Sequence, residues 1–207
     1  MARLLNERGI PFMTTWLADT HQPAPRIVYD HIVAAAKPAG HLLDLGHRRF
    51  AVLTGPLGRN RRLEERRGAI IDRLTARGVS ETDISTIEVP TYDLKNARES
   101  FRALLKGSGI PTALIASNDI LAAGVILECN AQGISVPGDL SVTGFGDIDI
   151  AAHFHPPITT IRTPRARVGT LAAEYLVARL EGANPQPQTL LDFELIVRET
   201  TALRLTG

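Results

Sequence analysis

Residues Val136–Pro164 read VPGDLSVTGFGDIDIAAHFHPPITTIRTP, and this stretch carries the strongest structural signal in the chain. Within it a short apolar run, Leu140–Phe145, is interrupted by Gly144 and leads through Gly146 to the carboxylate of Asp147. A strand that ends in glycines and an acid places a hydrogen-bonding side chain at the carboxyl edge of a sheet. Open α/β sheets bind their ligands at that edge. The stretch therefore predicts a small-molecule site on an α/β fold.

The bulk composition is that of an ordinary globular protein. The chain has 207 residues, of which 44% are hydrophobic and 22% charged, enough for one or two domains with a real core. The formal net charge of +1 provides no general basic field for nucleic acid. Cys129 is the only cysteine, which excludes an internal disulfide and fits a reducing cytoplasm. The first residues lack the pattern of a secretion signal, which favours a cytoplasmic location over a periplasmic one.

Outward from the opening stretch, strand and helix patterns alternate. The expected strands read as continuous apolar runs, which is typical of parallel strands buried on both faces. The alternation predicts helices on both faces of parallel sheets. Strands are expected at Ile10–Thr15, Arg26–Tyr29, Arg49–Thr54, Ile84–Val89, Thr112–Ala116, Ser141–Phe145, Thr159–Arg162 and Leu190–Val197. Helices are expected at Ile32–Leu45, Arg61–Arg77, Leu94–Lys106, 118–130 and Pro164–Leu180.

Four motifs carry a resemblance to a known family. They are GHLLDLGHRRFAVLTG at Gly40–Gly55, TALIASNDILAAG at Thr112–Gly124, GISVPGDLSVTGFGD at Gly133–Asp147 and PPITTIRT at Pro156–Thr163. In this order and spacing they resemble the LacI/GalR family of bacterial transcriptional regulators, over about Leu5–Thr201. The resemblance implies an α/β fold of the type I periplasmic-binding-protein kind, with two Rossmann-like subdomains, parallel sheets and a ligand in the cleft between them.

The resemblance also implies a domain layout. We expect an N-terminal subdomain of residues 1–46 plus 157–182 and a C-terminal subdomain of residues 47–156 plus 183–201. Nothing in the chain resembles the family's DNA-binding helix-turn-helix or its opening β-α-β-α stretch. The N-terminal subdomain is therefore expected to be incomplete, with exposed apolar strand edges, as in a truncated chain.

Candidate ligand residues lie where the expected strands end. Asn118 matches the family's cleft-facing asparagine, whose amide both donates and accepts, whereas Asp119 is expected to be mainly structural. Asp147 matches the second of two acids found in many sugar-responsive relatives, and Gly146 stands where the first would be. One carboxylate fewer tolerates an anionic ligand better, and GFGD is reminiscent of the family's gluconate-type branch.

Further ligand candidates come from a basic loop and two aromatic residues. Arg59 aligns with an effector-contacting arginine of some relatives, and Arg62 is the expected substitute for a second arginine that is replaced by Glu65. An arginine fork matches a carboxylate bidentately; the alternative is a solvated basic helix start. Tyr92 aligns with an aromatic that stacks on the effector, and Trp16 ends an expected strand at the cleft edge; ordinary surface or core packing is the alternative for each.

The resemblance also implies a set of residues at a dimer interface. The helix LAAGVILECN and the segment after GFGD would form it, which identifies Leu121, Val125, Glu128 and Ile150 as interface candidates. The helix is apolar on more than one face, which suits burial on both sides. The expected partners are a small effector, a second copy of the chain, and operator DNA only through a DNA-binding region that this chain lacks. No membrane partner is expected.

The sequence does not predict an enzyme. No P-loop, complete Gly-x-Gly-x-x-Gly or Gly-x-Ser-x-Gly elbow occurs, and we expect no catalytic residue and no cofactor. The histidines make no tetrahedral set with Cys129, so no metal site is expected. The preferred interpretation is the effector-sensing and dimerising core of a repressor that binds a sugar or sugar acid. The alternatives are a solute-binding protein for sugar transport, which would be monomeric, and a small-substrate hydrolase.

Overall fold

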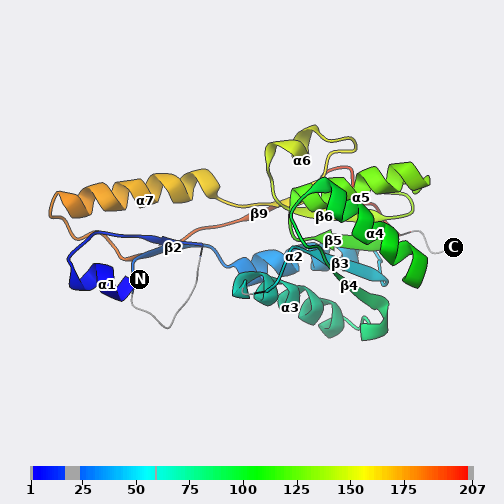
Figure 1. The fold of residues 1–207 in the computed structure, drawn as a ribbon, viewed down its shortest axis with the longest axis horizontal. Helices are drawn as coiled ribbons and strands as arrows, with labels where there is room; N and C mark the ends of the chain where they lie inside the picture. The colour runs from blue at the N-terminus through cyan, green and yellow to red at the C-terminus, as the bar shows by residue number, and fades with distance from the viewer. Residues whose placement is uncertain (1, 17–23, 59, 205–207) are drawn as a thin grey trace. The chain divides into compact units, whose positions relative to one another are not determined.

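The computed structural model describes residues 2–16, 24–58 and 60–204. The chain forms two compact units (Figure 1). The smaller unit comprises residues 1–31 and 163–193, and the larger unit comprises residues 32–162 and 194–207. Both are α/β, as expected. None of the described helices is long and apolar enough to cross a membrane.

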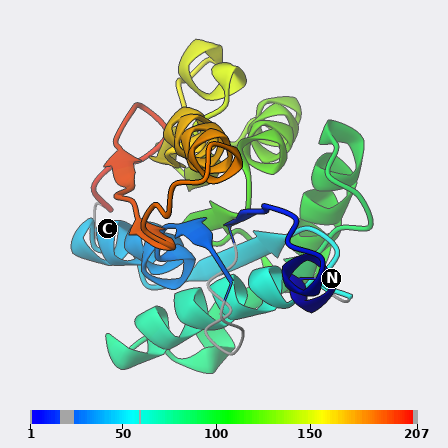
Figure 2. The ribbon, with the colours of Figure 1, turned by 90° about the vertical axis from the view of Figure 1, so that its left-hand side faces the viewer.

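The smaller unit is built on short parallel strands. Its sheet has the order β1-β2-β8, formed by Thr14–Thr15, Arg26–Val28 and Gln188–Leu190. Helix α1 covers Ala2–Glu7, and helix α7, Arg165–Leu180, packs along β2 (Figure 2). Only Val168 of α7 is fully buried, so this unit has a thin core.

The larger unit is built on a six-stranded sheet with the order β4-β3-β5-β6-β7-β9. The first five strands are parallel, and β9 runs antiparallel to β7. The strands are β3 Phe50–Thr54, β4 Ile84–Glu88, β5 Ala113–Ala116, β6 Ser141–Gly146, β7 Thr159–Arg162 and β9 Glu194–Ile196. Every residue of β3 and β5 is buried, as the continuous apolar runs predicted.

Helices cover both faces of this sheet. They are α2 His31–Asp44, α3 Arg61–Ala76, α4 Leu94–Ser108, α5 Asp119–Gln132 and α6 Asp149–His153, with a 3-10 turn at Glu81–Asp83. Helices α2 and α3 lie on one face and α4 and α5 on the other (Figure 1). The main core fills the space between the sheet and the α4–α5 pair. Helix α5 is sandwiched between α4 and α6, which explains its lack of a polar face.

Two expectations of the sequence are corrected. Leu190–Val197 is not one strand, because β8 ends at Leu190 in the smaller sheet and β9 begins at Glu194 in the larger one. Of Ile10–Thr15 only Thr14–Thr15 is strand. Helices α1 and α6 were not expected.

The division into units also differs from the expected subdomain boundaries. Helix α2 lies in the larger unit, where Pro38 lines a small buried space with Val52 of β3 and Leu63 of α3. Strand β7 pairs with β6, which keeps Thr159–Arg162 in the larger sheet. Strand β8 pairs with β2, which keeps residues 188–190 in the smaller one.

Candidate functional site

Four loops that follow neighbouring strands lie at one edge of the six-stranded sheet. Gly55 follows β3, Tyr92 follows β4, Asn118 follows β5 and Asp147 follows β6. Because these strands are parallel neighbours in the sheet, their carboxyl ends share one edge. This is the edge at which open α/β sheets bind ligands. Four residues that the sequence pattern separates by up to 92 positions are thus on the same side of the larger unit.

The ring of Tyr92 packs against Gly55. A Cβ added at Gly55 would overlap the ring and hydroxyl of Tyr92, so only glycine admits the ring in this position. Ser117 joins the cluster, because its hydroxyl accepts a hydrogen bond from the Gly55 amide at 3.2 Å and also interacts with the Tyr92 hydroxyl. Partial burial raises the pKa of the Tyr92 phenol, while the positive charges of Arg66 and Arg62 oppose that shift. Tyr92 is 42% exposed, which leaves part of the ring accessible.

Helix α3 brings arginines to this edge. Asn60 caps the helix by accepting a hydrogen bond from the Leu63 amide at 3.3 Å, and half-buried Arg62 lies in the first turn. Arg66 is only 8% exposed, and its guanidinium carbon lies 4.1 Å from the centre of the Phe145 ring. The predicted ligand residue Arg59 lies outside the described residues.

Asn118 and Asp119 stand between β5 and the first turn of α5. Asn118 is the N-cap of α5, since its Oδ1 accepts a hydrogen bond from the Leu121 amide at 2.8 Å. Asp119 is fully buried and accepts hydrogen bonds from the Ile148 amide at 2.9 Å and from the Thr160 hydroxyl. Burial raises the pKa of Asp119. Asp119 is therefore structural, as expected, while Asn118 contributes a cap in addition to any ligand contact.

Asp147 is the centre of an ion-pair network. Its Oδ2 lies 2.7 Å from Nε of Arg162 and its Oδ1 lies 2.7 Å from Nη2 of Arg198. Burial acts to raise the pKa of Asp147, but the hydrogen bonds from Arg198 and Arg162 outweigh it and hold the pKa below its ordinary value. Both carboxylate oxygens are engaged within the protein, so a ligand would have to share them.

Gly146 lacks a carboxylate for a backbone reason. Its φ of 123° lies in a region that side-chain-bearing residues rarely adopt. A side chain at this position would therefore strain the backbone at the end of β6, although space for a Cβ is present.

Trp16 belongs to the smaller unit. Its backbone has a φ of 71°, and its ring meets Tyr29 edge-to-face with the ring centres 5.8 Å apart. Tyr29 in turn lies 6.3 Å from Phe193. Trp16 therefore takes part in aromatic packing, the alternative raised for it from the sequence; its predicted ligand contact stays a prediction.

Three of the four residues expected at a dimer interface are buried within the larger unit. Leu121 and Val125 are fully buried in the main core. Glu128 is also fully buried and binds Arg102 at 2.7 Å and Arg98 at 3.2 Å, both from α4. These three side chains are corrected to interior positions, because α4 and α6 already cover α5. Ile150 is partly exposed while packing against the core.

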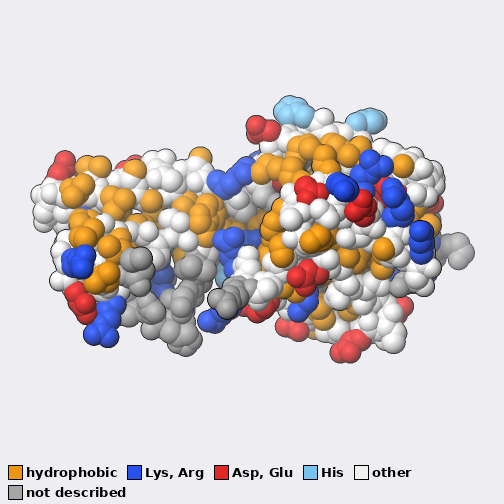
Figure 3. Space-filling view, viewed as in Figure 1, with side chains coloured by type: hydrophobic (Ala, Val, Ile, Leu, Met, Phe, Trp, Pro, Cys, Tyr) orange, Lys and Arg blue, Asp and Glu red, His pale blue; other side chains and the backbone are white. Residues whose placement is uncertain are grey.

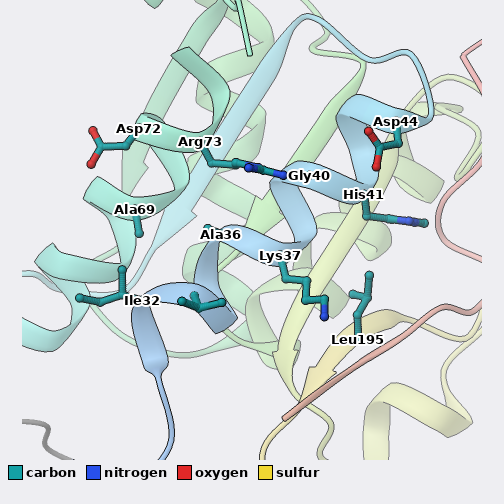
Figure 4. Close-up of a pocket in the computed structure, with 11 residues that line it drawn as sticks. Ile32, Ala36, Lys37, Gly40, His41, Asp44, Ala69, Asp72, Arg73 and Leu195 are labelled. Carbon is teal, nitrogen blue, oxygen red and sulfur yellow. The ribbon is translucent and has the colours of Figure 1, made fainter. Parts of the chain in front are cut away.

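A further cavity of the larger unit lies away from this edge. It measures about 730 Å³ and runs between α2 and α3, with Leu195 of β9 on its rim (Figure 4). Arg73 extends from α3 toward Gly40 of α2, whereas Asp72 points away. Apolar, basic and acidic side chains line this cavity, and they do not point toward one common position where a ligand could bind. We therefore place the candidate functional site at the carboxyl edge of the sheet.

No metal centre is evident in the part of the chain that the structure describes, where no three histidine, cysteine or acidic side chains form a group that could hold an ion. His153 and His155 are exposed on and after α6, where Figure 3 shows histidine side chains in pale blue. His47 is 2% exposed, with its Nε2 3.2 Å from the carbonyl oxygen of Ala202.

The comparisons with known proteins decide the family. The profile of the periplasmic binding protein-like domain matches residues 39–201. The chain belongs to this family. The ribose operon repressor of Haemophilus influenzae is 29% identical over 192 residues, covering 91% of this chain and 56% of the repressor. The repressor CytR of Escherichia coli is 29% identical over 210 residues, covering 97% of this chain and 59% of that protein.

Solved structures of the family agree in fold. The transcription regulator GntR of Chromobacterium violaceum superimposes with a TM-score of 0.87 and 27% identity, covering 96% of this chain and 73% of that one. A dimeric Lac repressor gives a TM-score of 0.84 and 25% identity, covering 94% of this chain and 70% of the repressor. The resemblance to LacI/GalR-type regulators is confirmed. The chain spans 56–59% of the length of these curated relatives.

Proposed function

We propose that this chain is the effector-sensing portion of a LacI-type transcriptional repressor. The observation that carries the proposal is the cluster of Tyr92, Arg62 and Asn118 at the carboxyl edge of the six-stranded sheet, in a chain of this family. An accessible aromatic ring next to hydrogen-bonding side chains suits a small polyhydroxylated ligand. The curated relatives are named as repressors, which supports a regulatory role over an enzymatic one.

The effector that this edge favours is a sugar acid of the gluconate type. The Asp147 carboxylate is neutralised by Arg162 and Arg198, and Gly146 contributes no second acid. Arg62 and Arg66 lie close enough to Tyr92 to influence its pKa. A carboxylate ligand therefore meets positive charge and little repulsion, and an arginine fork binds it with two hydrogen bonds.

The proposal includes a homodimer in a cytoplasmic repressor. A Lac repressor relative is described as dimeric, and a dimer would couple effector binding to the spacing of two DNA-binding regions. Binding to operator DNA is proposed for the full-length repressor. A sizing measurement separates this proposal from a solute-binding protein, because a monomer at micromolar concentration would favour the latter.

The test of the proposal is a thermal-shift panel of neutral sugars and matched aldonic acids. A ligand at about 100 times its Kd stabilises the folded state by about 2.7 kcal/mol, which should raise the Tm by several degrees. We expect the largest shift with an aldonic acid. A panel in which only hexoses shift the Tm would reject the acid preference, and a panel without any response would reject the sugar-sensing role.

A further inference from the structure

The ring of Tyr92 is held in place although the residue is 42% exposed. Its hydroxyl-bearing end fills the space beside Gly55, where a Cβ would overlap Cζ, Cε1 and the hydroxyl oxygen. Gly55 is not among the glycines with a positive φ, so the close approach of the ring, and not the backbone, requires glycine there. Fixing an exposed side chain costs conformational entropy that burial offsets only in part. The fixed position of this ring therefore needs a reason beyond packing.

Ser117, in the loop after β5, connects the two sides of this contact. Its Oγ accepts a hydrogen bond from the Gly55 amide at 3.2 Å. Its hydroxyl also forms a hydrogen bond with the Tyr92 hydroxyl; burial raises the pKa of the phenol, and this bond acts in the opposite direction. The Ser117 amide donates to the carbonyl oxygen of Leu53 in β3 at 2.8 Å. Ser117 is thus fixed to the end of β3 by backbone groups, and it fixes the phenol end of Tyr92.

A second network fixes the backbone on either side of Tyr92. Asp93 is the N-cap of α4 and accepts a hydrogen bond from the Asn96 amide at 2.8 Å. The Asn96 side chain donates to Asp93 at 2.7 Å and to the Thr91 hydroxyl at 2.8 Å, and the Thr91 hydroxyl donates to Asp93. The bond from the Asn96 amide, followed by those from Thr91 and the Asn96 side chain, lowers the pKa of Asp93 to about 2. Asp93 therefore stays ionised through neutral and alkaline pH, and the network persists there.

These contacts decide which part of Tyr92 a ligand can reach. The hydroxyl is engaged by Ser117 and the neighbouring ring edge lies against Gly55, which leaves the rest of the ring accessible. An aromatic face is an apolar surface against which the C–H groups of a polyhydroxylated ligand can pack. We propose that Ser117 is a positioning residue, which holds Tyr92 so that the ring, and not the phenol hydroxyl, contacts the effector. This inference rests on the proposed function and deepens it, since it states how the site presents its aromatic residue.

The experiment measures binding of gluconate and of its neutral alcohol, glucitol, by titration calorimetry on the full chain. In Ser117→Ala the affinity for each ligand that the wild type binds should fall about threefold to tenfold, because binding must then order a ring that the wild type holds in advance. The matched control is Ser141→Ala at the opposite end of a neighbouring strand, β6. The Ser141 hydroxyl also accepts a backbone hydrogen bond, from the Ala202 amide at 3.1 Å. This variant should keep the wild-type affinities.

Two further measurements distinguish positioning from a merely structural role. Tyr92→Phe removes the other end of the same hydrogen bond, so the double variant with Ser117→Ala should lose no more affinity than the weaker-binding single variant. Ultraviolet titration follows the Tyr92 phenol, which is identified by its loss in Tyr92→Phe. Because the bond from Ser117 lowers the pKa of this phenol, the pKa should rise in Ser117→Ala and stay unchanged in Ser141→Ala.

The outcomes separate this inference from the proposed function. A folded Ser117→Ala variant with wild-type affinity, additive losses in the double variant, or an unchanged pKa of Tyr92 would each overturn the inference and leave the sensing function intact. A wild type that binds neither gluconate nor glucitol would reject the proposed function, and the inference with it.

Discussion

The larger unit is organised around a deep core, whereas the smaller unit is not. In the larger unit every residue of β3 and β5 is buried, and eighteen buried residues form one cluster with α4 and α5. In the smaller unit the strands have two or three residues, and α7 buries Val168 alone. The buried apolar surface of the larger unit is sufficient to hold the ends of its strands in place. The smaller unit is stabilised by much less buried apolar surface.

The largest expected effect is on the free energy of unfolding, when a leucine is replaced by alanine in each unit. Leu121→Ala removes a fully buried side chain from the main core and should lower the free energy of unfolding by about 2–5 kcal/mol. The matched change Leu171→Ala on α7, where the side chain is partly exposed, should cost about 1 kcal/mol or less. Urea unfolding measures both. Equal losses would mean that the smaller unit is as well packed as the larger.

Amide exchange sharpens the same comparison without a mutation. The amides of β3 and β5 are central in the six-stranded sheet, whereas those of β1 lie at the edge of a short one. We expect exchange of the β3 and β5 amides to be at least about tenfold slower than that of β1 and β2, because local opening is easier where few apolar contacts are lost. Similar protection in both sheets would contradict the distinction.

The smallest effect concerns pH and involves the larger unit alone. Burial lowers the pKa of His47, and a hydrogen bond to the Ala202 carbonyl opposes this only in part. The unfolded chain therefore binds a proton more readily than the folded one, and stability should decline as the pH falls below about 6.5. Unfolding at pH 7.5 and pH 5.5 measures this loss, which should be smaller in His47→Gln. His153→Gln, an exposed control on α6, should retain the wild-type pH dependence.

Local patterns in the sequence predicted most of the larger unit. The run from Leu140 to Gly146 forms β6, and PPITTIRT contains β7, because buried parallel strands leave a continuous apolar signature. The local sequence pattern could not predict that Leu190–Val197 is divided between β8 and β9. Nothing in the hydrophobicity of this run shows that the chain leaves one sheet at Leu190 and joins another at Glu194.

The ligand contacts of the candidate site stay predictions. The structure shows that Arg62 lies near enough to Tyr92 for its charge to act on the phenol. The buried position of Arg66 was missed, because a run of arginines at a helix start indicates a solvated surface. The signal that could have revealed it is the helical spacing of Arg66 with the apolar residues Leu63, Ile70 and Leu74, which places all four on one face of the helix. The residues of α5 were assigned to a dimer interface because an apolar helix indicates burial on more than one side. The sequence pattern does not show that α4 and α6 of the same chain cover those sides.

The glycine at the end of β6 has a consequence for anyone who would re-engineer this chain as a biosensor. Gly146→Asp is the single change that would supply the acid found at this position in many sugar-responsive relatives. At a φ of 123° the new side chain would strain the backbone, and its carboxylate would join those of Asp119 and Asp147 at one strand end. A design that places an acid at this position would first have to rebuild the turn from Phe145 to Ile148, because the strand end as it stands fits a glycine backbone.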